Sequence, residues 1–335
     1  MGTPQVLVNE YRGGILECMH YGSIAVCDEK GLLKGLGDTD FFTFYRSSSK
    51  PIQMLPLLQL GLDKKYGLTD EEISIMSGSL WCGPRQVELV KSIMQKADIS
   101  YDTLIMLPCY PMGHDYELAL RAAGEKESKL YHNCIGKHLC LIMVQREFGN
   151  EADYYKLESA VQQRILEAIS LFTDVPKEKI GVGIDGCGVP VFAVPMVNMS
   201  TSFVRLVAPE LLADASLAEA TRRNVEIISR YPENLMDARA LCGVLCRDPN
   251  IVGKVGAQGV YTLGLKKERL GITCKLYEGV SAYFPLILAE ILEQLGYENR
   301  ETIERLRTTF PAEIINATGA VVGEKKAEFT LLDLR

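Results

Sequence analysis

The chain changes its pattern twice, from strand-like to helical and back to strand-like. Residues 6–36 form short segments with strand character, joined by a turn. From Pro51 on, apolar residues recur with the spacing of an amphipathic helix, and helical stretches dominate the middle of the chain. Strand-like segments return at residues 180–184 and 189–194, then at 260–265 and 270–276, and residues 320–332 close the chain with strand character. This order predicts an α/β chain of the α+β type, in which helices flank one antiparallel sheet built from both chain ends.

We therefore expect a single domain over residues 1–335. The sheet is expected from about residues 1–45 and 255–335, and a mostly helical inserted portion from about residues 50–250. No internal repeat, low-complexity tract or Pro/Ser-rich linker divides the sequence. At the strand level, we expect residues 15–21 and 24–27 to form two separate strands.

Charge and hydropathy exclude several classes of function. The chain has 36 Lys and Arg against 43 Asp and Glu, a net charge of −7, and no basic cluster, so a nucleic-acid partner is not expected. No apolar run approaches the ~18 residues of a membrane span, and the first residues do not resemble a signal peptide. The 10 Cys are scattered without a Cys-x-x-Cys motif, which is typical of buried thiols in a reducing compartment. We expect a cytoplasmic protein.

Two serine and lysine motifs indicate acyl-transfer chemistry. Ser47 precedes Lys50 by three residues at a helix start, where a desolvated amine can take the proton of a hydroxyl. Lys254 is followed by Gly256, Ala257 and then a strand. Serine acyl-transfer enzymes of the penicillin-recognising kind line the far wall of their site with such a segment. The alternatives are a Ser-rich helix cap and an ordinary basic loop. Both motifs in this order favour the catalytic interpretation.

Cysteines in two other segments suggest a metal site. Cys134 lies three residues before Lys137, and Cys187 follows the turn at Asp185. Two thiolates could bind Zn²⁺, completed by His132, His138, Lys137 or water. Buried structural cysteines are the alternative interpretation.

Four stretches, in this order along the chain, resemble the signature blocks of the rhizobial-type L-asparaginases, a serine-dependent and zinc-carrying family of amidohydrolases. They are residues 46–53 (Arg-Ser-Ser-Ser-Lys-Pro-Ile-Gln), 132–138 (His-Asn-Cys-Ile-Gly-Lys-His), 183–190 (Gly-Ile-Asp-Gly-Cys-Gly-Val-Pro) and 254–259 (Lys-Val-Gly-Ala-Gln-Gly). The resemblance extends from about Tyr11 to Gly279. It implies a fold like that of the serine β-lactamases and glutaminases, and a homodimer.

The resemblance also implies roles for individual residues. Ser47 corresponds to the nucleophile and Lys50 to its base, while Ser79 and Lys254 correspond to a second Ser/Lys pair. The remaining correspondences are zinc ligands at Cys134, Lys137 and Cys187, with Asp185 and His138 beside them. We expect the backbone amides of Ser47 and Ala257 to hold an oxyanion, and Arg46 to be available for a substrate carboxylate.

The chain departs from the family around Ser79, where the usual block is Ser-His-Ser-Gly-Glu-Pro-x-His. Its His, Glu and His positions are Leu80, Gly83 and Gln86 here. Gln258 stands where Glu is usual, and Ile135 where Ser is usual. Because these changes remove polar groups from one wall, they concern the substrate more than the chemistry.

We expect an amidohydrolase of asparaginase type that converts a side-chain carboxamide of a small amino-acid amide into the acid and ammonia. One alternative keeps this chemistry but changes the amide to glutamine or a modified asparagine. The other is a zinc-bound binding homologue without turnover.

Overall fold

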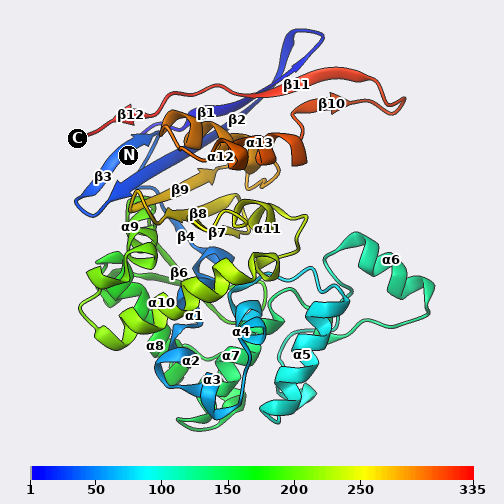
Figure 1. Cartoon of the computed structure of the whole chain (residues 1–335), viewed down its shortest axis with the longest axis vertical. Coiled ribbons are helices and arrows are strands. Elements are labelled where there is room, and N and C mark those ends of the chain that lie inside the picture. The colour runs from blue at the N-terminus through cyan, green and yellow to red at the C-terminus, as the bar shows by residue number, and fades with distance from the viewer. Residues whose placement is uncertain (1) are drawn as a thin grey trace.

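The computed structural model describes residues 2–335, and its main sheet joins the two ends of the chain (Figure 1). Neighbouring strands follow the order β10-β11-β1-β2-β9-β8-β7, β3 pairs with β2 and β12 pairs with β3, and every pairing is antiparallel. The strands are β1 (Gln5–Arg12), β2 (Ile15–Asp28), β3 (Gly31–Leu36), β7 (Ile251–Gly256), β8 (Val260–Leu265), β9 (Leu270–Leu276), β10 (Glu313–Ile315), β11 (Val321–Ala327) and β12 (Leu332–Asp333). The predicted fold class is confirmed.

Strand β2 corrects one detail of the prediction, because residues 15–28 form a single strand of 14 residues instead of two. Gly22 lies in the middle of β2, opposite Leu276 of β9. A Cβ atom at Gly22 would overlap the carbonyl oxygen of Lys275 and lie 2.6 Å from the Leu7 side chain. The glycine therefore permits close packing within a continuous strand instead of ending it.

Helices cover both faces of the sheet. Helix α9 (Met196–Val207) packs on β2, β8 and β9, where Gly271 leaves room for the carbonyl oxygen of Ser200. Helix α12 (Phe284–Gln294) packs against the opposite face through a contact between Phe284 and Tyr261, with ring centroids 5.5 Å apart. Helix α13 (Arg300–Thr309) packs beside α12.

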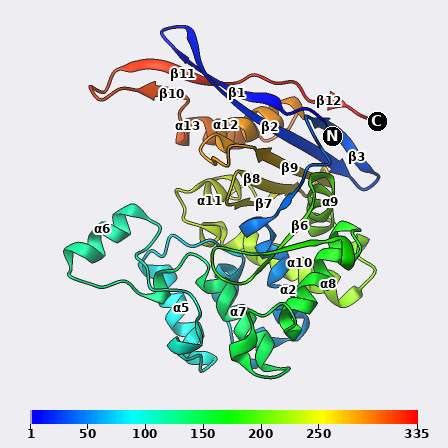
Figure 2. The ribbon, with the colours of Figure 1, turned by 180° about the vertical axis from the view of Figure 1, so that it is seen from behind.

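The remaining helices form the inserted portion below the sheet (Figures 1 and 2). They are α1 (Lys50–Gln53), α2 (Leu55–Gln59), α3 (Leu62–Lys65), α4 (Asp70–Ser74), α5 (Pro84–Lys96), α6 (His114–Ala122), α7 (Ile135–Arg146), α8 (Ala160–Thr173), α10 (Ala215–Arg230) and α11 (Leu241–Leu245). A second sheet has the order β4-β6-β5, formed by β4 (Phe42–Phe44), β6 (Pro190–Pro195) and β5 (Gly181–Ile184). In both views α6 protrudes from the body beside α5. Among residues 2–335, no helix has the length and apolar character needed to span a membrane.

Candidate active site

Ser47 lies in a tight turn between β4 and α1. The turn is a 3-10 helix over residues 46–49. The hydroxyls of Ser48 and Ser49 donate to the carbonyl oxygens of Tyr45 (2.7 Å) and Arg46 (3.2 Å), and both serines are buried. In the part of the chain that the structure describes, the partly exposed Ser47 side chain has no hydrogen-bond partner. Of the three consecutive serines, Ser47 alone therefore has an uncommitted hydroxyl.

The end of strand β7 lies directly against this turn. A Cβ atom at Gly256 would overlap the Tyr45 carbonyl oxygen and lie 3.3 Å from the Ser48 amide nitrogen. Arg46 adopts a left-handed conformation with φ 51°, which side chains other than glycine rarely take. Such strain persists where the surrounding structure enforces it, and it is common at functional sites. The glycine thus brings Ala257 to the turn that carries Ser47.

Lys50 contacts Ser79. The buried Lys50 Nζ donates to Ser79 Oγ (3.0 Å) and to the Gly78 carbonyl oxygen (2.6 Å). Over residues 2–335 no side-chain hydrogen bond joins Lys50 to Ser47 or Lys254 to Ser79, so neither expected pair is hydrogen-bonded in this arrangement. A buried amine needs hydrogen-bond partners, and the extended backbone at Gly78 supplies an acceptor beside the Ser79 hydroxyl.

Lys254 is the second buried amine of the site. Its Nζ donates to the Val255 carbonyl oxygen (2.8 Å), and the side chain is fully buried. The pKa of Lys254 is lowered to about 8, chiefly by burial and also by the charge of Lys50, against the opposing effect of Cys242. An amine with this pKa is partly neutral near pH 8 and can accept a proton.

The structure brings the three expected zinc ligands together. Lys137 Nζ lies 3.1 Å from Cys187 Sγ and 3.8 Å from Asp185 Oδ2. A hydrogen bond from Cys187 strongly lowers the pKa of Cys134 and raises that of Cys187. Burial alone would lower the pKa of Lys137, but the charges of Cys187, Cys134 and Asp185 raise it. The negative charge of this cluster and the amine of Lys137 thus stabilise each other.

Asp185 connects this cluster to the serine turn. Arg46 Nε donates to Asp185 Oδ1 (2.7 Å), and Asp185 is largely buried. Burial would raise the pKa of Asp185, but the charge of Lys137 and the hydrogen bond from Arg46 lower it. Arg46 is therefore engaged by a carboxylate of the protein itself.

His138 has one free ring nitrogen. Its Nδ1 lies 2.8 Å from the Tyr154 hydroxyl, whereas the buried Nε2 has no partner among residues 2–335. Burial lowers the pKa of His138 well below its usual value, so the imidazole is neutral. In the same residues no three His, Cys, Asp or Glu side chains form a metal-binding group by themselves. The donor set of Cys134, Cys187 and Lys137 therefore fits zinc only with the lysine amine as third ligand.

The positions that depart from the family carry structural contacts. Leu80 is buried, and its amide donates to the Asn133 carbonyl oxygen (2.9 Å). Gln86 holds the loop, since its Oε1 accepts from the Cys82 amide (2.9 Å) and its Nε2 donates to the Met236 carbonyl oxygen (2.9 Å). Gln258 adopts a left-handed conformation with φ 62°.

Tyr116 of α6 occupies the space beside Gly83. A Cβ atom at Gly83 would lie 2.7 Å from the Tyr116 ring. The Tyr116 hydroxyl donates to Asp237 Oδ2 (2.9 Å), and Asp237 pairs with Arg239 (2.8 Å). Arg239 also lies over the Trp81 ring, 5.5 Å from its centroid. Sequence reasoning missed this cluster, because no motif connects positions so far apart in the chain.

We expect Gly83→Ala to lower the free energy of unfolding by about 1–3 kcal/mol, because the added methyl group collides with the Tyr116 ring. The same substitution on a Tyr116→Ala background should cost markedly less, since the obstacle is gone. Chemical denaturation of the four proteins of this cycle measures the difference. Equal costs on both backgrounds would show that Tyr116 does not occupy this space.

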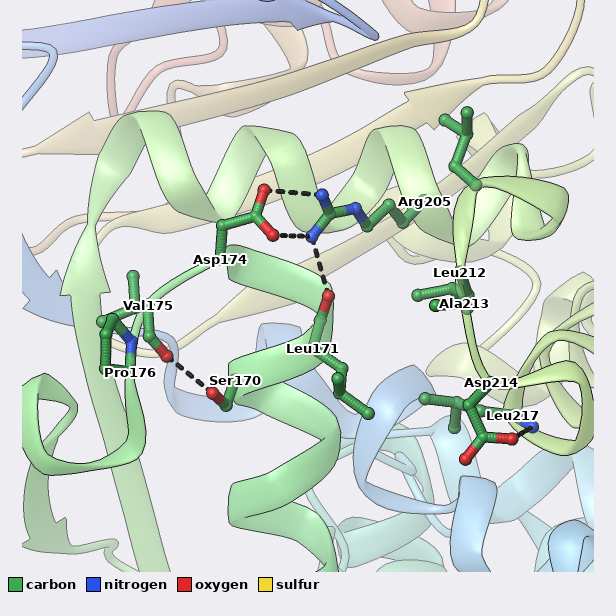
Figure 3. A pocket seen from close by; sticks show the side chains of 11 residues that line it. Ser170, Leu171, Asp174, Val175, Pro176, Arg205, Leu212, Ala213, Asp214 and Leu217 are labelled. Atoms are coloured by element: carbon green, nitrogen blue, oxygen red, sulfur yellow. Dashed lines mark hydrogen bonds and ion pairs between the residues drawn. The ribbon is translucent and has the colours of Figure 1, made fainter.

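A cavity of about 420 Å³ lies between α8 and α10, away from these residues (Figure 3). Its charged groups are already paired, because Arg205 binds Asp174 (2.8 Å) and the Leu171 carbonyl oxygen (2.7 Å). Asp214 accepts from the Leu217 amide (3.0 Å) at the start of α10. No candidate site residue lines this cavity.

Comparison with known proteins identifies the class and then the family. The chain is an amidohydrolase, because the model of the L-asparaginase II family matches residues 8–327. It belongs to the L-asparaginase II family. The substrate of this class is a small-molecule amide. A search of curated proteins finds no match.

Solved structures with detectable similarity include a β-lactamase from Mycobacterium bovis, with 14% identity and a TM-score of 0.41 over 82% of this chain and 94% of that one. Another is a structure described as Mglu, with 16% identity and a TM-score of 0.45 over 82% of this chain and 67% of that one. The family assignment rests on the family model alone.

Proposed function

We propose that this protein is an L-asparaginase-type amidohydrolase in which Ser47 attacks the side-chain carboxamide of a small amino-acid amide. The observation that carries the proposal is the uncommitted Ser47 hydroxyl in a strained turn. This turn leads directly into Lys50, whose buried amine contacts Ser79 (3.0 Å). Lysine amines serve as bases for serine where no histidine contacts the nucleophile.

The first half of the reaction forms an acyl-enzyme. Ser47 Oγ bonds to the carboxamide carbon while its proton passes to Lys50, which we propose as the base. The C–N bond then breaks, and the leaving nitrogen receives that proton and departs as ammonia. Ser79 and Lys254 relay protons and support the charge at Lys50.

The second half of the reaction hydrolyses the acyl-enzyme. Water attacks the ester carbon, a proton of this water passes to Ser47 Oγ, and the acid leaves.

The backbone amides of Ser47 and Ala257 are proposed to hold the oxyanion. Neither amide donates a hydrogen bond within the described part of the chain. Preorganised amides of this kind stabilise the tetrahedral intermediate because they do not reorganise during the reaction. The packing of Gly256 against the Tyr45 carbonyl oxygen supports their closeness.

We propose one zinc ion per chain, held by Cys134, Lys137 and Cys187, with Asp185 and His138 beside it. Zinc would keep Lys137 as a neutral amine by displacing its proton, and it would supply positive charge to this end of the site. The residues of the chain then bind and orient the substrate: Asp185 fixes Arg46, and Arg46 offers its remaining donors to a carboxylate.

The Tyr116 side chain beside Gly83 favours a related substrate over L-asparagine itself. The family glutamate at this position has no space here, so an ammonium group of the substrate lacks that partner. Glutamine and a modified asparagine are the alternative amides, and a zinc-bound binding protein without turnover is the alternative of another class. Ammonia release from a panel of small amides separates the three. If the pocket is altered as proposed, Gly83→Glu on a Tyr116→Ala background raises kcat/KM for L-asparagine.

The family resemblance further supports a homodimer, which light scattering would detect as twice the 37.2 kDa of one chain.

We expect the activity to depend on the protonation of Lys254. Its pKa is lowered from 10.5 to about 8, so below pH 8 the amine carries a proton and cannot accept another. The value of kcat/KM should rise about tenfold per pH unit below this pKa and level off above it. Between pH values of about 8 and 10.5, Lys254 is protonated in the unfolded chain but mostly neutral in the folded protein. The free energy of unfolding therefore rises with pH over this range. A pH–rate profile that stays flat around pH 8, or keeps its inflection in Lys254→Met, would contradict this assignment.

A further inference from the structure

Lys254 lies on β7, the last strand along the path of the main sheet. In an antiparallel pair, alternate residues direct their backbone groups toward the neighbouring strand and away from it. The amides of Gly253 and Val255, on the two sides of Lys254, point away from β8. At a sheet edge such amides need acceptors from elsewhere, and a buried amide without one is destabilising.

Two cysteine sulfurs supply these acceptors. The Val255 amide donates to Cys242 Sγ (3.3 Å), and the Gly253 amide donates to Cys246 Sγ (3.2 Å). The Cys246 thiol donates in turn to the Gly253 carbonyl oxygen (3.4 Å). Both cysteines are fully buried, so water does not compete for these contacts.

The spacing of the cysteines matches the spacing of the amides. Cys242 lies in α11, and Cys246 is the residue at its C-terminal end. Four residues of an α-helix rise about 6 Å, and two residues of a strand span about 6.6 Å. One turn of α11 therefore places a sulfur opposite each outward-facing amide. Burial raises the pKa of Cys246, so its thiol keeps the proton that it donates.

We propose that Cys242 and Cys246 are positioning residues that fix β7 on both sides of Lys254 and thereby hold its amine in the active site. This inference rests on the proposed role of Lys254. Within the described residues the Lys254 amine has one acceptor, the carbonyl oxygen of Val255. Val255 is also the residue whose amide Cys242 binds. Cys242 also receives a hydrogen bond from the Tyr261 hydroxyl (3.8 Å), opposite Val255 on β8.

Amide hydrogen exchange tests the contacts without reference to activity. In Cys242→Ala, exchange at Val255 should accelerate by about tenfold or more, and in Cys246→Ala the same should hold at Gly253. The control is Cys274→Ala, which truncates another buried cysteine, this one on β9 of the same sheet. Its thiol makes no hydrogen bond within residues 2–335. Cys274→Ala shows how much exchange accelerates when a buried cysteine is truncated without loss of such a contact. Exchange at both amides that is no faster than in this control would overturn the proposal.

Two further measurements test the consequence for Lys254. In protein labelled with ¹³C at the lysine ε-carbons, the Lys254 resonance, identified by its absence in Lys254→Met, should move in Cys242→Ala and stay in Cys274→Ala. In parallel, kcat for ammonia release from the amide of the panel that is hydrolysed fastest should fall about tenfold in Cys242→Ala with KM within about twofold. Cys242→Ser should recover most of the loss.

These outcomes separate this inference from the proposed function. A Lys254→Met variant with full turnover would refute the role of Lys254 but leave the exchange and resonance results standing. Faster exchange at Val255 with an unmoved Lys254 resonance would mean that the cysteines only stabilise the strand, and the positioning role would be wrong.

Discussion

Replacement of Ser47 by alanine should lower kcat for ammonia release by at least about 10³-fold, because no other hydroxyl of the turn is free to attack. The unfolding free energy should change by less than about 0.5 kcal/mol, since the Ser47 side chain is partly exposed and makes no hydrogen bond in the described chain. Steady-state ammonia release and thermal unfolding measure the two effects.

The matched control is Ser48→Ala in the same turn. It removes a buried hydrogen bond to the Tyr45 carbonyl oxygen (2.7 Å) and should cost about 1 kcal/mol of stability while turnover persists. If Ser47→Ala retains turnover, the nucleophile must be sought at Ser79, whose hydroxyl already contacts Lys50. Ser79→Ala would then abolish the reaction.

Loss of one cysteine of the proposed zinc site should have the second large effect. The purified protein is expected to carry about one zinc per chain, and Cys187→Ala should reduce this content at least tenfold, because one thiolate and Lys137 remain as ligands. The melting temperature should fall as well, since bound metal stabilises the folded state by mass action. Elemental analysis and thermal unfolding with and without added zinc provide the measurements.

Cys140→Ala is the control for this experiment. Cys140 is buried in the same helix as Lys137, and its sulfur has only a weak contact with the Met54 carbonyl oxygen (3.8 Å). It should lose stability through the cavity but keep its zinc. Metal-free wild-type protein, with Cys134 and Cys187 freely alkylated in the native state, would refute the zinc site.

The fold was predictable because its strands and helices have different periods in the sequence. The strand pattern at both chain ends predicted the antiparallel sheet, since period-two segments separated by turns have few other solutions. The length of β2 was not predictable, because the role of Gly22 depends on Leu7 and on β9, which follows about 250 residues later. From the sequence alone, a glycine within a strand pattern can mark either the end of the strand or a close approach of another backbone.

The candidate site was likewise predictable from the sequence only in part. The short spacings from Ser47 to Lys50 and from Cys134 to Lys137 pointed to two segments that Asp185 connects, because it contacts both Arg46 and Lys137. The contact between Lys50 and Ser79 depends on the extended backbone at Gly78, which no spacing reveals. Tertiary packing alone decides such contacts.

The order of the sheet has a consequence for synthesis on the ribosome. Residues 24–27 of β2 are almost entirely buried in the folded protein, but their partner strand β9 begins only at Leu270. A nascent chain therefore exposes this apolar segment for most of its elongation, which invites chaperone binding. Ser47, Ser79 and Cys134 leave the ribosome long before Lys254 does. On the proposed role of Lys254, the nascent chain cannot turn over its substrate before this residue has emerged.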